Sequence, residues 1–294
     1  MRQYSPFWII VVAALLLGAA SPGGPFQFTS FDFPNAVSTT AFGINPGGDI
    51  VGSYRDTAGV NHGFLMSGGN FSAINFPGAL ATQPRGINPG GDIVGNYRAP
   101  GGTQPASLHG FLLSQGTFST VLFPGHPGSI LQRISPSGSI YGCYHDTEPL
   151  DNPTMFGFVR NADGSFAAID VPSSMHNGAT PDGSTIVGLF DDLATGLTHG
   201  YFVENGSFAP FDVPNSNFTQ AWDINPAGDV VGVFRDTAGK VHGFLRAAHG
   251  GFATIDFPGA IVTQAFGINP GGDIVGNYTD SKGKTHAFLR SRPD

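Results

Sequence analysis

A segment of seven residues recurs six times along the chain, and this repeat constrains the fold more than any other feature. Each copy runs from a phenylalanine to a proline through apolar residues, as in Phe252-Ala-Thr-Ile-Asp-Phe-Pro258. The six copies begin at Phe28, Phe71, Phe118, Phe166, Phe208 and Phe252. Successive copies are 43, 47, 48, 42 and 44 residues apart. A period of about 40–45 residues with four strands per unit is typical of β-propellers.

The last full period shows why each unit is expected to hold four strands. Apolar runs at 252–257, 263–269, 273–278 and 286–289 are separated by turns rich in Gly, Asn and Asp. Such turns suit short antiparallel strands, because Gly adopts positive φ without steric cost. No stretch after residue 25 sustains a 3.6-residue period, so we predict almost no helix.

The phase of the repeat predicts how the ring closes. The first repeat opens with a lone outer strand at 27–33, and the last one stops before its own outer strand. We therefore predict an all-β, six-bladed β-propeller of four-stranded blades at 26–291, in which the N-terminal strand completes the last blade. The expected blades span about 38–77, 81–124, 129–172, 176–214, 218–258, and 262–291 plus 27–33. An open β-solenoid is the alternative, but it needs capping repeats at its ends.

The N-terminus and the composition bear on location and partners. Residues 1–20 resemble a signal peptide, with Arg2, an apolar core and a small-residue cleavage site. We therefore expect a secreted or periplasmic monomer with no membrane span after signal removal. The net charge of −8 argues against a nucleic-acid partner. The single cysteine, Cys143, excludes an internal disulfide and is expected to be a buried apolar residue.

One signature identifies a family that the chain resembles. It is Gly267-Ile-Asn-Pro-Gly-Gly-Asp-Ile-Val-Gly-Asn-Tyr278 followed by His286-Ala-Phe-Leu289, and close variants begin at Gly43, Gly86 and Asp223. This pattern resembles the HAF family of bacterial extracellular repeat proteins. The resemblance covers essentially the whole chain after residue 25. It implies export from the cell, and it implies no particular activity or catalytic residue.

Histidine and aspartate recur at fixed repeat positions, which raises the question of metal or acid–base chemistry. The recurring residues are His62, His109, His199, His242 and His286, with Asp32, Asp170, Asp212 and Asp256 in the outer strand and Asp49, Asp92, Asp229 and Asp273 after a turn. One histidine per blade would lie too far from the next to share a metal ion, so we expect hydrogen bonds to turns instead. We predict no metal site and no cofactor, although the acidic turn at Asp191 and Asp192 leaves calcium open.

A single functional site should lie where the repeats differ from one another. The position before Ile-Asn is glycine in four units but Arg133 and Asp223 in two, and glycine suits close approach near a crowded axis. The neighbouring positions also vary. The candidate ligand-binding residues at a pore mouth are Arg85, Gln132, Arg133, His176, Asn177, Trp222 and Asp223. The alternative is sequence drift plus an Arg133–Asp223 ion pair that braces the pore.

Two functions follow from these patterns. The first is a non-catalytic, exported repeat propeller that binds a carbohydrate or protein partner through similar pockets between blades or through a rim surface. The second is a hydrolase or lyase with one active site at the pore mouth. In that version Arg133 would stabilise an anion while His176 or Asp223 acts as general base. It requires those three side chains to converge on one cavity.

Overall fold

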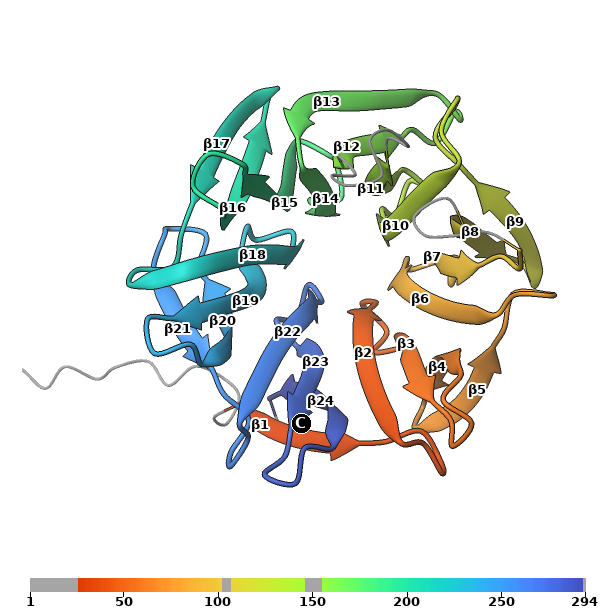
Figure 1. The fold of residues 1–294 in the computed structure, drawn as a ribbon, viewed down its shortest axis with the longest axis horizontal. Helices are drawn as coiled ribbons and strands as arrows, with labels where there is room; N and C mark the ends of the chain where they lie inside the picture. Colours follow the sequence, from red (N-terminus) through yellow and green to blue (C-terminus); the bar gives the residue numbers. More distant parts are fainter. Residues whose placement is uncertain (1–25, 102–106, 146–154, 293–294) are drawn as a thin grey trace, which may run out of the picture.

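The protein is an all-β propeller. A computed structural model describes residues 26–101, 107–145 and 155–292, so the expected signal peptide lies outside the described residues. The sheets are arranged around a central axis, with one strand of each sheet innermost and one at the outer edge (Figure 1). The described ranges contain no helix, as the repeat predicted, and hence none that could cross a membrane.

The strands are short and follow one another through tight turns. The first twelve are β1 (Gln27–Phe31), β2 (Ser38–Ile44), β3 (Ile50–Arg55), β4 (Asn61–Ser67), β5 (Asn70–Ile74), β6 (Ala81–Ile87), β7 (Ile93–Arg98), β8 (Leu108–Ser114), β9 (Thr117–Val121), β10 (Gly128–Ile134), β11 (Ile140–His145) and β12 (Met155–Arg160). The others are β13 (Phe166–Pro172), β14 (Ser174–Ala179), β15 (Thr185–Asp192), β16 (Leu197–Glu204), β17 (Ser207–Phe211), β18 (Ser216–Ile224), β19 (Val230–Asp236), β20 (Val241–Arg246), β21 (Phe252–Ile255), β22 (Val262–Ile268), β23 (Ile274–Thr279) and β24 (Thr285–Ser291).

The sheets differ from the expected six separate blades in one respect. Four sheets have four strands each, ordered β2-β3-β4-β5, β6-β7-β8-β9, β10-β11-β12-β13 and β1-β24-β23-β22. The remaining strands, β14 to β21, belong to one eight-stranded sheet. Its two halves are joined by a single parallel pair, Thr198 of β16 with Phe218 of β18. The repeat could not predict this pair, because it depends on how closely two neighbouring sheets approach.

The ring closes through the first strand, as predicted. β1 pairs antiparallel with β24 from Gln27↔Ser291 to Phe31↔Ala287, and both lie together at the outer edge in Figure 1. Phe28 of β1 packs edge-on against Phe257 and Phe288, with ring centroids 5.4 and 5.5 Å apart. Closure of this kind removes a free sheet edge and ties both ends of the ring together.

The hydrophobic core lies between adjacent sheets. One cluster joins Val51 and Ile74 of the β2–β5 sheet to Ile87, Ile93 and Phe111 of the β6–β9 sheet. Its members are at least nine-tenths buried. Each sheet therefore stabilises its neighbours, and the whole ring folds around several equivalent cores.

The antiparallel order gives the propeller two distinct faces. One end carries the turns after the innermost strands, each with a proline, and we call it the proline face. These prolines are Pro46, Pro89, Pro136, Pro181, Pro226 and Pro270. The opposite end carries the connections from the outermost strand of one sheet to the innermost strand of the next, such as residues 32–37 and 75–80. We call this end the crossover face.

Candidate functional site

The innermost strands β2, β6, β10, β14, β18 and β22 surround the axis (Figure 1), and each contains a β-bulge at the same repeat position. The register with the second strand skips one residue, for example between Ala41 and Gly43 and between Leu131 and Arg133. The skipped residues are Phe42, Arg85, Gln132, Asn177, Trp222 and Phe266. We call these six residues the bulge ring.

Glycine follows the bulge in four of the six strands because the strands nearly touch at the axis. A Cβ on Gly43 would lie 2.7 Å from the Arg85 carbonyl oxygen, and one on Gly267 would lie 2.8 Å from the Phe42 carbonyl oxygen. Real Cβ atoms do not approach this closely without moving the backbone. The strands approach closely at these positions, as the glycine pattern predicted, so Arg133 and Asp223 are the exceptions that need an explanation.

Arg133 and Asp223 fill the axis together. Arg133 Nη1 donates to the carbonyls of Arg85 and Gln132, each at 2.8 Å. Its Nη2 donates to the carbonyl of Phe42 at 3.0 Å and to that of Phe266. Its Nε lies 3.2 Å from Asp223 Oδ2, an ion-pair contact without hydrogen-bond alignment. Four innermost strands are thereby linked through one guanidinium.

The carboxylate of Asp223 is held as firmly as its partner. Oδ1 accepts from the backbone N–H of Ile224 and Oδ2 from that of Ile268, each at 3.0 Å. Burial raises the pKa of this carboxyl, although Arg133 and the two N–H groups oppose the rise. The arrangement matches the ion pair that the sequence left open as an alternative to a ligand site.

The bulge ring has an aromatic half and a polar half. The Arg85 guanidinium lies 4.1 Å above the Phe42 ring, and Trp222 meets Phe266 edge-on at 5.1 Å. On the polar side, Gln132 Nε2 donates to Met175 Sδ at 3.0 Å, and Asn177 Nδ2 donates to the Ala221 carbonyl at 2.8 Å. Burial, followed by Arg133, lowers the pKa of Arg85 to about 10. One polar atom on each of Arg85, Gln132, Asn177 and Trp222 has no hydrogen-bond partner among the described residues.

His176 lies away from this group. It is fully buried in β14, and its ring fills the space over Gly157 of the preceding sheet. Its Nδ1 shares a hydrogen bond of 2.5 Å with the Tyr201 hydroxyl. Burial lowers the pKa of His176 to about 3, so the imidazole is neutral at pH 7. The structure therefore joins Arg133 to Asp223 but does not bring His176 to the same cavity.

The proline face opens into a small cavity above the axial ion pair. It is lined by the six turn prolines, by the five isoleucines and Ala179 that precede them, and by Arg133 and Asp223. Its volume is about 90 Å³, whereas drug-sized ligands occupy pockets of roughly 300–1,000 Å³. The cavity is therefore smaller than the usual pocket for a ligand of that size.

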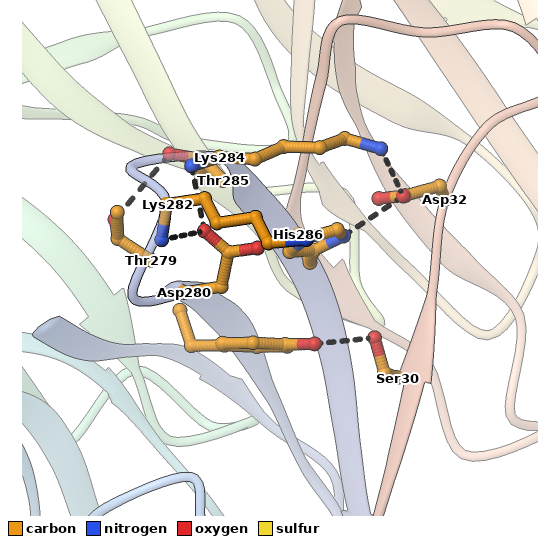
Figure 2. A network of polar contacts seen from close by, with 9 residues as sticks. Ser30, Asp32, Thr279, Asp280, Lys282, Lys284, Thr285 and His286 are labelled. Atoms are coloured by element: carbon orange, nitrogen blue, oxygen red, sulfur yellow. Dashed lines mark hydrogen bonds and ion pairs between the residues drawn. The ribbon is translucent and has the colours of Figure 1, made fainter. Parts of the chain in front are cut away.

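The repeated histidines lie on the crossover side of the sheets. Four of them bind aspartate carboxylates, whereas His109 Nδ1 shares a hydrogen bond of 3.1 Å with the Tyr97 hydroxyl. His286 Nδ1 lies 2.8 Å from Asp32, and its Nε2 faces Asp280 at 3.6 Å, as Figure 2 shows. His242 bridges Asp256 and Asp236 in the same way, at 2.8 and 3.5 Å. These contacts support the expected structural role. No metal-binding cluster of His, Cys, Asp or Glu occurs in the part of the chain that the structure describes.

Two further predicted structural roles are supported. Asp49 accepts from Asn45 Nδ2 at 3.0 Å and donates its backbone N–H to Asn45 Oδ1 at 2.9 Å. The same reciprocal pair recurs at Asn88 with Asp92 and in the two later units. Cys143 is fully buried, and burial raises the pKa of its thiol to about 12, so it packs as an apolar residue.

Two clefts on the crossover face were missed by the sequence analysis. The Arg98 cleft lies between the β2–β5 and β6–β9 sheets, has a volume of about 330 Å³, and is lined by Arg55, Val60, Asn61, Leu80, Gln83 and Arg98, among others. The Lys282 cleft lies between the last sheet and the first, has about 630 Å³, and is lined by Val37, Ser38, Arg55, Lys282, Lys284 and Thr285, among others.

The two clefts occupy equivalent repeat positions. Arg55 in the Lys282 cleft corresponds to Arg98 in the Arg98 cleft, since each follows a tyrosine and is the last residue of the second strand of its unit. Val37 corresponds to Leu80 in the same way. The only indication of these clefts in the sequence was the arginine that follows Tyr54 and Tyr97. A repeated surface arginine does not by itself predict a cleft, because the neighbouring sheet forms the other wall.

Comparisons with known proteins add the fold alone. No family model and no curated protein matches the chain. Its structure is similar to a chain assigned as TolB from Agrobacterium tumefaciens, with a TM-score of 0.59, 16% identity, and coverage of 92% of this chain and 100% of that one. The similarity to TolB from Acinetobacter baumannii has a TM-score of 0.56 and 14% sequence identity. It covers 87% of this chain and 64% of that longer protein.

Both binding proteins and enzymes occur among the similar structures. A lectin of Aleuria aurantia in complex with Fucα1-6GlcNAc gives a TM-score of 0.53 and 11% identity, covering 88% of this chain and 95% of the lectin. A gluconolactonase of Xanthomonas campestris gives a TM-score of 0.54 and 12% identity, covering 94% of this chain and 99% of the gluconolactonase. At such identities the similarity establishes a β-propeller fold and leaves the activity open.

Proposed function

We propose that this chain is an exported, non-catalytic propeller of the HAF type that binds carbohydrate in clefts between neighbouring sheets on its crossover face. We also propose that it has six blades, since the eight-stranded sheet divides into two four-stranded halves at one bridging pair. The lectin named above supports the proposal to the extent that a related fold binds sugar.

The observation that carries this proposal is the equivalence of the Arg98 and Lys282 clefts. A site that the repeat itself generates is present in several copies, and several weak sites on one molecule bind a polymer with high avidity. Both clefts fall within the size range of ligand pockets. The Arg98 cleft also offers amide groups on Asn61 and Gln83 beside the exposed side chain of Leu80, a combination that suits hydroxyl groups and the apolar face of a sugar.

The contacts of Arg133 and Asp223 fit a structural brace at the axis better than an active site. Four N–H donors of Arg133 are already used by carbonyl groups, so few remain for a substrate anion. His176, the other general base considered, is buried between sheets against Tyr201. For these reasons we favour binding over a hydrolase or lyase at the pore mouth.

A glycan array with residues 21–294 and two double variants tests the proposal. Asn61→Ala with Gln83→Ala alters the Arg98 cleft, and Arg133→Ala with Asp223→Ala removes the axial pair. We expect the wild type and the axial variant to bind the same glycans, and the cleft variant to bind them at least several-fold more weakly. Loss of binding in the axial variant alone, with that variant folded, favours a single channel site. No binding to any glycan by the wild type contradicts the proposal.

A further inference from the structure

Cations are concentrated in the two clefts although the protein as a whole is acidic. The chain has 13 Lys and Arg against 21 Asp and Glu. Four of those cations line two adjacent clefts: Arg55 and Arg98 in one, and Arg55, Lys282 and Lys284 in the other. Because Arg55 lines both, the clefts form one continuous surface across the last, first and second units.

Three of these four cations have no carboxylate partner within the described residues. Lys284 Nζ pairs with Asp32 at 2.9 Å. In contrast, Arg55 Nε donates only to the Gly59 carbonyl at 3.2 Å, and no ion pair in the described ranges involves Arg98 or Lys282. These three positive charges are therefore free to pair with a ligand.

The nearby turn aspartates are occupied by their own turns. Asp56 accepts from the backbone N–H of Val60 at 2.8 Å and binds His62 at 3.0 Å. Asp280 accepts from the backbone N–H groups of Lys282 and Lys284, each at 2.9 Å. These backbone hydrogen bonds are the largest cause that lowers the pKa of each carboxyl. These contacts hold both carboxylates within their turns, so neither forms an ion pair with Arg55, Arg98 or Lys282.

The neutral groups between the cations suit a sugar chain. Asn61 and Gln83 lie in the Arg98 cleft, where their side-chain amides make no hydrogen bond to any described residue. Thr285 and Ser38 supply hydroxyl groups in the Lys282 cleft. Leu80 and Val37 are about half exposed, at 47% and 50%. Separate anion-binding and hydroxyl-binding groups along one surface fit a ligand that carries both kinds of group at intervals.

We propose that the Arg98 and Lys282 clefts together bind an acidic polysaccharide, with its anionic groups paired to Arg55, Arg98 and Lys282. This inference rests on the proposed function and names its ligand class. The shared chemistry is a sugar polymer with carboxylate or sulfate groups. Guanidinium groups bind either anion through two parallel N–H···O bonds, so Arg55 and Arg98 form the stronger contacts.

The test measures binding of polygalacturonate, dextran sulfate, neutral dextran and single-stranded DNA to wild-type protein by isothermal titration calorimetry. Arg55→Gln with Arg98→Gln is the cleft variant. Arg160→Gln is the matched control, because Arg160 ends β12 at the proline face. Because it loses two charged hydrogen-bond donors, the cleft variant should bind the acidic polymer at least about tenfold more weakly. The Arg160→Gln variant should bind as the wild type does.

Each outcome has a distinct meaning. Preference for polygalacturonate identifies carboxylate as the anion, and preference for dextran sulfate identifies sulfate. Equal binding of neutral and acidic dextrans, with glycan binding retained on the array, overturns the acidic ligand while leaving the proposed function standing. Equal loss in the Arg160→Gln variant, or equally tight binding of single-stranded DNA, shows non-specific attraction and overturns the inference. Absence of all sugar binding overturns both.

Discussion

Arg133 shows how one side chain can replace a repeated glycine without breaking the ring. Its guanidinium occupies the axis, where four other strands place a residue with no side chain. Four carbonyls and Asp223 satisfy it. A buried charge is tolerated only when it is paired and hydrogen-bonded. The two exceptions to the glycine pattern therefore depend on each other.

This dependence predicts a strong coupling between the two residues. Arg133→Gly should lower the free energy of unfolding by about 3–5 kcal/mol, because Asp223 is left as an unpaired buried charge. The double variant Arg133→Gly with Asp223→Gly should be more stable than that single variant, since glycine occupies this position in the other four units. Urea unfolding of the two single variants and the double variant measures the coupling. Additive losses would contradict a mutual role.

His176 should make the protein sensitive to mild acid. Its folded pKa is about 3 against an ordinary value of 6.5, so the unfolded chain binds the proton more readily. The stability from a neutral His176 is fully present above pH 6.5 and is lost as the pH falls towards 3. Between pH 7 and pH 4.5 this loss is about 3 kcal/mol, at roughly 1.4 kcal/mol per pH unit.

Urea unfolding of His176→Leu at several pH values tests this expectation. Leucine is compatible with the site, because Leu131 occupies the equivalent position in β10. The variant should lose less stability than the wild type between pH 7 and pH 4.5. An identical pH dependence in both proteins would show that His176 is not the group responsible.

At the scale of the element, the close approach of the innermost strand to the second strand explains a second repeated glycine. In each pair, a carbonyl group two residues before the bulge lies against a glycine of the second strand. A Cβ on Gly142 of β11 would overlap the carbonyl oxygen of Ile130, and one on Gly52 of β3 would overlap that of Thr40. The glycine of the Val-Gly or Tyr-Gly step in the second strand therefore leaves the space that a carbonyl group of the innermost strand occupies.

Replacement of that glycine should strongly destabilise the protein. We expect Gly142→Ala to lower the free energy of unfolding by more than about 4 kcal/mol, a loss typical of overpacked or strained core sites. Gly251→Ala is a suitable control, because a Cβ there would meet only His249, at 3.9 Å. Thermal unfolding followed by circular dichroism compares the two. Equal, small effects would show that the strands can separate to admit a methyl group.

At the scale of the whole molecule, closure by β1 predicts that the chain can be permuted. Gln27 and Ser291 are direct partners in the last sheet, so a hairpin-sized linker of about 2–5 residues can join residue 292 to residue 26. Opening the chain between Gly259 and Ala260 then makes β22, β23, β24 and β1 consecutive. This permutant should fold with a free energy of unfolding close to that of the parent.

Urea unfolding and circular dichroism of the permutant measure this. A second permutant opened between Gly276 and Asn277, inside β23, is the control and should not fold, because it cuts a strand that pairs on both sides. Failure of the first permutant, with the linker lengthened, would show that the order of synthesis matters to closure.

The sequence alone determined the repeat, the strand-rich class, the closure by the first strand and the crowding at the axis. These features are local or periodic, so the sequence of each repeat indicates them independently. It also identified Arg133 and Asp223 as exceptions, because the six units can be compared with one another. The structural roles of His286 and Asp49 followed from the same comparison, whereas that of Cys143 followed from its being the single cysteine.

Only the tertiary structure decided which of the residues that depart from the repeat pattern lie in contact with one another. His176 and Asn177 are neighbours in the chain, yet the bulge sends one between sheets and the other to the axis. The Thr198–Phe218 pair and the Arg98 and Lys282 clefts arise where different sheets face each other. Their geometry depends on the distance between units rather than on the residues within one. For that reason a repeat can specify its own four strands but not the surface that it forms with the next.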